Sequence, residues 1–179
     1  MSIYYPTCPD TITDPVCTPC PEVERGRIRG IGFKKATFSF TDETDPTEWD
    51  NAIADNNVYV FPAVHGSFSQ TEVEGVGFGD QEVTLDGYEN VLEVFEPNYE
   101  DNYGFWNTIK NSREWEPIYV TESKMHIASE VCTIIPKQPV DDDLTSRVVW
   151  AATIKWKQED LLQPQDKPGN VFDVCTAPS

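Results

Sequence analysis

Residues 147–157 alternate apolar side chains with less apolar ones more strictly than any other part of the chain. The apolar series consists of Val148, Trp150, Ala152, Ile154 and Trp156. The alternate positions hold Val149, Ala151, Thr153, Lys155 and Lys157. Successive side chains of a strand point to opposite faces, so the pattern predicts a long strand with one buried face. A chain with such a strand must fold around a sheet.

Shorter apolar segments, separated by polar residues, proline and glycine, predict further strands. They cover residues 31–40, 58–64, 117–121 and 124–135. The segment 82–96 is also strand-like, but Asp86-Gly87 interrupts it. That dipeptide indicates either a tight hairpin or a bulge in one long strand.

Two segments have the capping residues of helices. Asp45-Pro46, with Glu48 three residues after the cap, predicts a short helix that begins there. A longer helix is predicted over residues 98–113, where Asn98 is in position to cap. Its apolar stripe consists of Phe105, Trp106 and Ile109.

The order of these elements predicts a mainly β protein, because helices are too few for a doubly wound sheet. We expect an antiparallel sandwich or partly open barrel with one packed helix near residues 99–113. The domain would cover residues 23–162. Residues 1–22, rich in Pro, Thr, Cys and Asp, predict an extended N-terminal arm, and residues 163–179 an extended C-terminal tail.

The chain of 179 residues is strongly acidic, with a formal net charge of −18. Such a charge repels free nucleic acid and anionic membrane surfaces. It is compatible with a negative channel through which DNA slides, and equally with a role in solubility alone. The longest apolar runs are too short to span a bilayer, and the N-terminal segment does not resemble a secretory signal. We therefore expect no membrane partner.

Four of the five cysteines lie in the terminal segments. Cys17 and Cys20 form a C-x-x-C pair, which is half of a zinc site, and Cys8 and Cys175 complete it only if the two ends meet. The alternatives are solvated thiols and terminal disulfides. Cys132 lies in an apolar run and is interpreted as a core residue. No cofactor is expected.

A short basic patch follows the predicted arm in this acidic chain. It consists of Arg25, Arg27, Arg29, Lys34 and Lys35. This local asymmetry indicates a docking surface for an acidic neighbour, such as another copy of the chain. The competing interpretation is a solvated strand edge whose cations block pairing with other strands.

Residues 65–81 are interpreted as a loop with alternating glycines. Its interface candidates are Gly75, Gly77, Phe78, Gly79 and Asp80. The spacing is not that of a dinucleotide-binding fingerprint. The loop is expected either to order against a neighbouring subunit or to be an ordinary hairpin tip.

No arrangement of residues indicates catalysis. Ser67 lacks the surroundings of a nucleophile elbow, and His65 and His126 have no evident nucleophile beside them. The 31 acidic residues make chance carboxylate pairs easy, and nothing singles out two of them. We expect a protein that is not an enzyme.

Several stretches together resemble small virion proteins of phages and prophages of Bacteroidetes-type bacteria. They are Phe38–Trp49, Val73–Asp80, Asn98–Arg113, Ile134–Lys137 and Val148–Trp156. The order of elements is similar to that of a phage tail tube subunit, and the likeness covers roughly residues 23–160.

The resemblance implies a sandwich with a flanking helix that assembles into stacked rings, hexameric in that family, around an acidic lumen. Val148–Lys157 would be a sheet strand, and residues 1–22 and 66–80 would contact neighbouring subunits. The partners would be copies of the chain and other virion proteins, with DNA only as cargo. The protein would be assembled in the host bacterial cytoplasm and reside in the virion tail.

Two alternatives stay open at this point. The first is a head decoration, connector, adaptor or fibre-anchoring protein of the same virion. The second is a carbohydrate-binding sandwich that presents exposed aromatic side chains such as Tyr99, Tyr103 or Trp115. The cysteine-bearing ends do not map onto the tail tube family.

Overall fold

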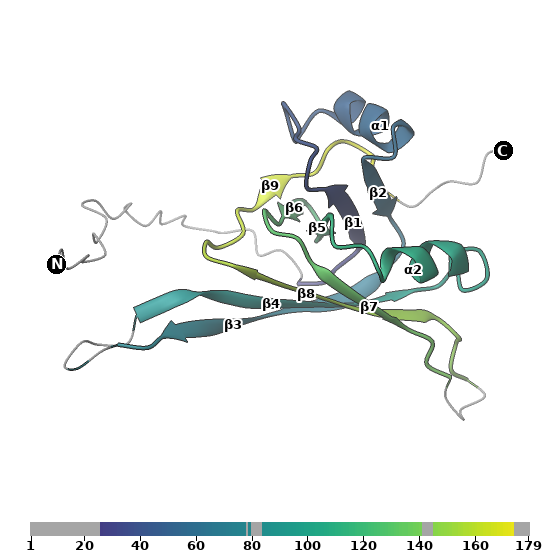
Figure 1. Ribbon diagram of the computed structural model, residues 1–179. Helices are drawn as coiled ribbons and strands as arrows, with labels where there is room; N and C mark the ends of the chain where they lie inside the picture. Colours follow the sequence, from purple (N-terminus) through teal and green to yellow (C-terminus); the bar gives the residue numbers. More distant parts are fainter. Residues whose placement is uncertain (1–25, 78, 80–83, 141–144, 174–179) are drawn as a thin grey trace, which may run out of the picture.

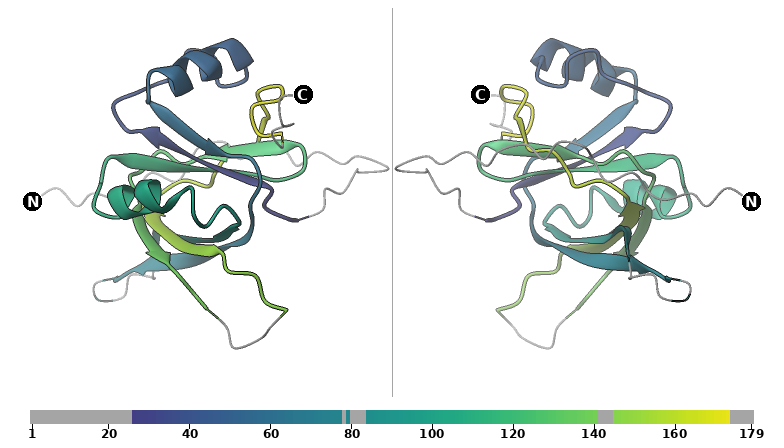
Figure 2. Two further views of the ribbon diagram at one scale, coloured as in Figure 1. Left: turned by 90° about the vertical axis from the view of Figure 1, so that its right-hand side faces the viewer. Right: turned by 90° about the vertical axis from the view of Figure 1, so that its left-hand side faces the viewer.

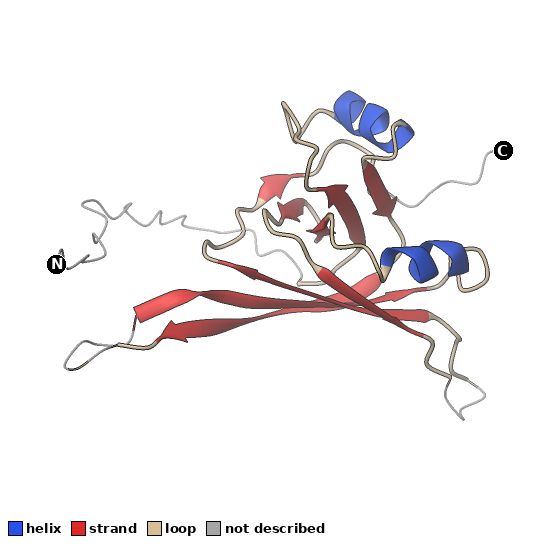
Figure 3. Cartoon of the chain, viewed as in Figure 1, coloured by secondary structure: helices blue, strands red, loops and turns tan. Residues whose placement is uncertain are grey.

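The computed structural model describes residues 26–77, 79, 84–140 and 145–173, and the predicted arm 1–22 lies outside these ranges. The described chain forms two antiparallel sheets that pack face to face without closing into a barrel (Figures 1 and 3). The prediction of a mainly β sandwich is confirmed. Two helices accompany the sheets, one in each of the two segments for which a helix is predicted.

The strands divide unevenly between the sheets. In the five-stranded sheet the order is β2 (Val58–Phe61), β1 (Gly30–Lys35), β5 (Trp115–Val120), β6 (Lys124–Ile127) and β9 (Gln165–Asp166). In the four-stranded sheet it is β3 (His65–Gly75), β4 (Thr84–Glu96), β8 (Trp150–Gln158) and β7 (Thr133–Lys137). The single strand predicted over 124–135 is therefore two strands, β6 and β7, in different sheets. The residues between them cross from one sheet to the other.

Strand β8 has the alternation that the sequence predicts. Its buried residues are Trp150, Ala152, Ile154, Trp156 and Gln158. It lies between β4 and β7, so both of its edges are paired. The apolar series meets the five-stranded sheet across the main core, which also contains Phe33, Leu92 and Trp106. Cys132 belongs to this core as predicted, and burial raises the pKa of its thiol to about 12.

Helix α1 (Pro46–Ala54) begins where the capping pattern predicts. The side chain of Asp45 accepts a hydrogen bond from the Thr47 amide at 2.9 Å, and Pro46 occupies the first turn. Glu48 accepts bonds from the Thr41 and Asp42 amides at 2.6 and 2.8 Å. Those bonds fix the loop that enters the helix. Beneath α1 lies a second core cluster, built around Trp49, Val58, Ile118, Met125 and Phe172.

Helix α2 (Tyr103–Ile109) is shorter than the helix predicted over 98–113. Its N-cap residue is Asn102 rather than Asn98, and the backbone amide of Asn98 donates to the side chain of Glu96 at 2.8 Å. The other carboxylate oxygen of Glu96 accepts from the indole of Trp106 at 3.4 Å. This buried carboxylate therefore joins the end of β4 to α2.

The loop interpretation of residues 65–81 is wrong for most of its length. His65–Gly75 form β3, which pairs along its whole length with β4 as one long hairpin. Asp86-Gly87 marks a bulge in this hairpin rather than a turn. Val73 pairs with Gly87 and Glu74 with Leu85, so Asp86 has no counterpart. Gly87 has a φ of 128°, a conformation that favours glycine.

The described part of the predicted C-terminal tail folds back onto the domain. Gln165–Asp166 pair with β6, and the side chain of Phe172 is only 5% exposed. Its ring meets that of Trp49 at 5.3 Å between centroids. The prediction of an extended tail from residue 163 is thus wrong as far as Asp173. Burial of this aromatic ring explains why the segment docks.

Candidate assembly interface

Strand β3 is an edge strand with an open outer side. In the four-stranded sheet it pairs only with β4, and within the described chain its outer side makes one isolated bridge, between Gly66 and Ile28. From Ser67 to Gly75 the backbone N–H and C=O groups on that side have no strand partner among the described residues. Such an edge is a template for another strand.

The composition of β3 does little to prevent such pairing. Its sequence, HGSFSQTEVEG, has no lysine, arginine or proline, which are the residues that commonly block an edge. Its only charged side chains are Glu72 and Glu74, close to the tip. The opposite edge strand, β7, is shorter and contains Pro136 and Lys137. The two edges of the sheet therefore differ in length and chemistry.

The β3–β4 hairpin extends beyond the rest of its sheet. Strand β8 pairs with β4 only as far as Tyr88, opposite Gln158. Beyond that point β3 and β4 pair only with each other, as a two-stranded ribbon (Figure 1). Near the base of this ribbon, the side-chain amide of Gln70 donates a hydrogen bond to the side-chain oxygen of Asn90 at 2.8 Å. A two-stranded ribbon in water is marginally stable alone, so a surface on another chain would stabilise it.

The face of the four-stranded sheet that points away from the core carries mixed charge. Along its paired positions, the charged residues of the described strands are Glu89, Glu93, Lys137, Lys155 and Lys157. Three lysines and two glutamates do not make an acidic surface. Where β3 forms this face, its residues are small and polar, such as Ser67, Ser69 and Thr71.

A basic cleft of about 640 Å³ lies between the ends of the two sheets. Its floor is largely apolar and includes Val64, Phe95, Val120 and Phe172. Two of its four cationic residues come from the segment before β1, one from the segment before β8 and one from the segment after β9. The four are Arg27, Arg29, Arg147 and Lys167. We call these residues and this floor the basic cleft.

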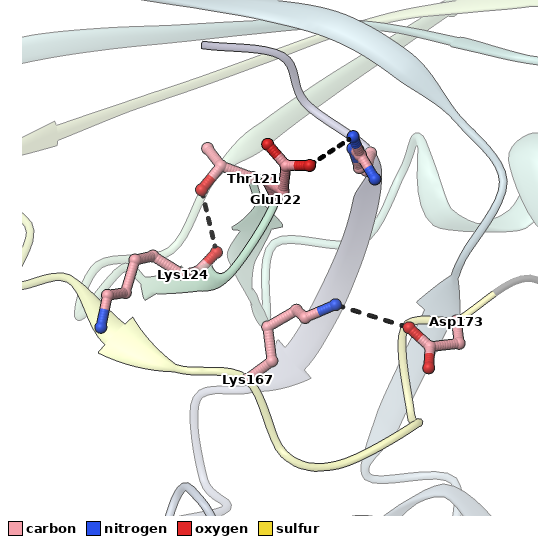
Figure 4. Close-up of polar contacts among 6 residues, drawn as sticks. Thr121, Glu122, Lys124, Lys167 and Asp173 are labelled. Atoms are coloured by element: carbon pink, nitrogen blue, oxygen red, sulfur yellow. Dashed lines mark hydrogen bonds and ion pairs between the residues drawn. The ribbon is translucent and has the colours of Figure 1, made fainter. Parts of the chain in front are cut away.

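Two of the four cations are neutralised by neighbouring carboxylates. Arg29 pairs with Glu122 at 3.1 Å, and Lys167 with Asp173 at 3.4 Å (Figure 4). Arg27 and Arg147 are exposed, and no described carboxylate lies within ion-pair distance of either. Since the whole chain carries a charge of −18, a cleft with two arginines that meet no described carboxylate is a local reversal of sign.

The structure divides the predicted basic patch. Arg27 and Arg29 join the cleft, and Arg25 lies outside the described residues. Lys34 is not at the surface: it forms a buried ion pair with Glu116 and donates to the Phe38 carbonyl at 2.9 Å. Lys35 lies over the ring of Trp115, 5.7 Å from its centroid. The expectation of one continuous patch is therefore wrong.

The predicted glycine-loop candidates are placed only in part. Gly75 ends β3, and Gly77 and Gly79 follow it toward the tip, where Gly79 has a φ of 68°. Phe78 and Asp80 lie outside the described residues. Whether this tip contacts a neighbour stays a prediction.

The cysteines of the proposed zinc or disulfide site also lie outside the described residues. They are Cys8, Cys17, Cys20 and Cys175. Within the described ranges there is no group of three or more His, Cys, Asp or Glu side chains placed to hold a metal ion.

The two histidines lie in different sheets. His65 of β3 stacks near Phe95 at 5.2 Å between ring centroids, and His126 of β6 stacks on Tyr119 at 4.6 Å. Burial raises the pKa of Tyr119 to about 12, so its hydroxyl stays protonated. His65 is exposed and His126 half-buried. These contacts single out no acid, base or nucleophile for catalysis.

The aromatic residues proposed as a sugar platform are mostly occupied within the fold. Trp115 is only 6% exposed, which is incompatible with a surface platform. Tyr99 stacks on Trp150 at 5.2 Å, and its hydroxyl accepts a bond from Gln138 at 3.0 Å. Tyr103 alone of the three is well exposed, at 57%.

Sequence reasoning missed Arg147 and Lys167 as members of the cleft. They lie more than a hundred residues from Arg27 along the chain, and they meet it because the segments before β8 and after β9 lie beside the segment before β1. No local pattern marks them. It also missed the β3 edge, because an exposed strand has no apolar alternation to detect.

Comparisons with protein-family models, with curated protein sequences and with solved structures returned no match. Among the described helices, neither α1 nor α2 has the length and apolar character needed to cross a membrane.

Proposed function

We propose that this chain is a structural virion protein that assembles with copies of itself, as the subunit of a phage tail tube. One observation carries the proposal: the outer side of β3 from Ser67 to Gly75 is a long strand edge without the residues that block pairing. The ribbon that extends from this edge supports it further. Both features suit contact with another chain better than they suit an enzyme.

The two edges of the four-stranded sheet suggest how copies would join. If β3 of one copy pairs with Thr133–Ile135 of β7 in the next copy, ahead of Pro136 and Lys137, the contact is head-to-tail. Repetition of this contact forms a ring when the rotation between successive copies closes. Six copies would align about 24 strands, and barrels of 16–18 strands already leave an aqueous channel. DNA would pass through such a channel as cargo, and other virion proteins would bind the ends of the tube.

The sheet face that would line this channel has mixed charge rather than acidic charge. It carries Glu89 and Glu93 beside Lys155 and Lys157 on neighbouring strands. An acidic lumen is therefore not part of the proposal. Paired charges of both signs would still give DNA phosphates few uncompensated cations to bind.

The test compares two identical substitutions at matched places. Thr71→Lys puts a cation on the β3 edge strand, and Thr153→Lys puts one on the central strand β8. Both threonines face away from the core and pair with a glutamate of β4, Glu89 and Glu93 respectively. Light scattering and negative-stain microscopy would measure assembly, and circular dichroism would check the fold of both variants.

We expect rings or tubes from the unmodified chain and from Thr153→Lys, and folded monomers from Thr71→Lys. Equal assembly of all three would show that the β3 edge is not the contact. A monomeric unmodified chain would contradict self-assembly and favour a decoration, connector or fibre-anchoring role on a partner protein. A reducing and a non-reducing buffer would separate any contribution from the terminal cysteines.

A further inference from the structure

The segment 42–55, which contains α1, concentrates negative charge. It has six carboxylates and neither lysine nor arginine. None of its carboxylates forms an ion pair with a described cation. We call residues 42–55 the acidic knob, because both views in Figure 2 show α1 projecting at the end remote from the four-stranded sheet.

The carboxylates of the acidic knob have two different roles. Asp42, Asp45 and Glu48 accept hydrogen bonds that hold the loop and the helix start. Asp50 and Asp55 are exposed, and their side chains accept no hydrogen bond from a described residue. These two are therefore free to meet a cation on another molecule.

The basic cleft is the matching surface of opposite sign. Arg27 and Arg147 are exposed and meet no described carboxylate, as Asp50 and Asp55 meet no described cation. The apolar floor around Phe95 and Val120 suits a polypeptide segment, which brings apolar side chains with its charges, better than a free inorganic anion. Exposed Ile53, in the same helix as Asp50, is such a side chain.

We infer that the acidic knob of one copy docks against the basic cleft of a second copy. The inference rests on the proposed self-assembly and adds a second contact to the β3 edge. Opposite charges would steer the approach and set the register, and like charges would oppose other arrangements. The contact would weaken as salt rises, because exposed charges are screened within about 10 Å at 0.1 M ionic strength.

The test uses full-length chains with reversed charges. A cleft variant carries Arg27→Glu and Arg147→Glu, and a knob variant carries Asp50→Lys and Asp55→Lys. A control carries Arg113→Glu and Lys155→Glu, which changes the net charge as the cleft variant does. Both control residues are exposed and lie outside the cleft, the knob and the sheet edges. Sedimentation velocity would measure association for each chain and for mixtures.

Each variant alone should associate roughly tenfold or more weakly than the unmodified chain, and the control should not. An equimolar mixture of the two variants should recover association, because the reversed cleft of one meets the reversed knob of the other. A cleft variant that is impaired while the knob variant assembles normally would overturn the inference, since another segment would then occupy the cleft.

The outcomes separate this contact from the proposed function. Normal assembly of both variants, with loss of assembly in Thr71→Lys, would overturn the knob–cleft contact and leave the edge contact standing. An unmodified chain that stays monomeric at low salt would overturn both. Recovery in the mixture that high salt abolishes is the pattern expected of the charge pairing described here.

Discussion

Strands of the two sheets differ in how many of their residues are buried. In the five-stranded sheet all six residues of β5 are buried, and so are five of the six in β1. In the four-stranded sheet β3 has no buried residue along its eleven positions. The comparison teaches that burial and the proposed contact surface are separated: strands of both sheets form the core, and the β3 edge of the four-stranded sheet stays exposed.

The largest effect is expected in the shared core. Trp106 is fully buried, and its ring stacks on Phe61 at 5.5 Å. Trp106→Ala should lower the free energy of unfolding by about 3–5 kcal/mol through lost burial and a cavity. Tyr103→Ala, on the same helix but 57% exposed, should change it by about 0.5 kcal/mol or less. Urea unfolding of both variants measures the difference, and equal effects would contradict the described packing.

The next effect contrasts two ion pairs of the five-stranded sheet. The side chains of Lys34 and Glu116 are only 10% and 11% exposed, whereas those of Lys124 and Asp166 are 42% and 78% exposed. Lys34→Met leaves Glu116 buried without its cation and should cost about 3–5 kcal/mol. Lys124→Met should cost about 1 kcal/mol or less. If thermal unfolding shows the two costs to be alike, β1 and β5 do not bury their charges as described.

A third prediction concerns how β3 is held to the four-stranded sheet. A Cβ on Gly66 would lie 2.1 Å from the backbone oxygen of Glu93, which is too close without a shift of β3. Gly66→Ala should therefore destabilise the fold by about 1–3 kcal/mol. Gly104→Ala in α2 meets no atom within 4 Å and should stabilise by about 0.5–1 kcal/mol. Opposite signs in urea unfolding are expected, and a neutral Gly66→Ala would contradict the close pairing of β3 with β4.

The smallest effect is a pH dependence at the acidic knob. Hydrogen bonds from the Thr41 and Asp42 amides lower the pKa of Glu48. A lowered folded-state pKa means that the carboxylate contributes stability above its unfolded pKa and loses it as the pH falls through the folded-state value. Below about pH 4, Glu48→Gln should lose less stability on acidification than the unmodified chain does. The thermal stability of both chains would be measured as the pH is lowered. Equal losses of stability in the two chains would contradict the prediction.

The parts of the fold that the sequence predicts are those whose signal is local. Strand β8 alternates because one face packs in the core, and α1 begins at Asp45 because a cap and a proline act within one turn. The helix predicted over 98–113 is longer than α2 at both ends, and at its start the backbone amide of Asn98 donates to Glu96 instead of Asn98 acting as the cap. That interaction depends on burial, which the spacing does not reveal.

The candidate site could be predicted only in part. Arg27 and Arg29 stand out as a basic cluster, but Lys34 beside them pairs with Glu116 in the interior, which only strand pairing explains. Arg147 and Lys167 reach the cleft through the sheet topology. Strand β3 is interpreted as a loop from the sequence because, apart from Phe68, it has few apolar residues and no apolar period. The features on which the proposed contacts depend are thus the least visible in the sequence.

Hydrogen exchange of the backbone amides of β3, measured in dilute and in assembled protein, tests the central claim most directly. The account predicts that amides between Ser67 and Gly75 that exchange fast in the monomer become protected on assembly. Amides of β5, already buried, should change little. Assembled particles in which the outer amides of β3 still exchange as in the monomer would contradict the claim that this edge joins the copies.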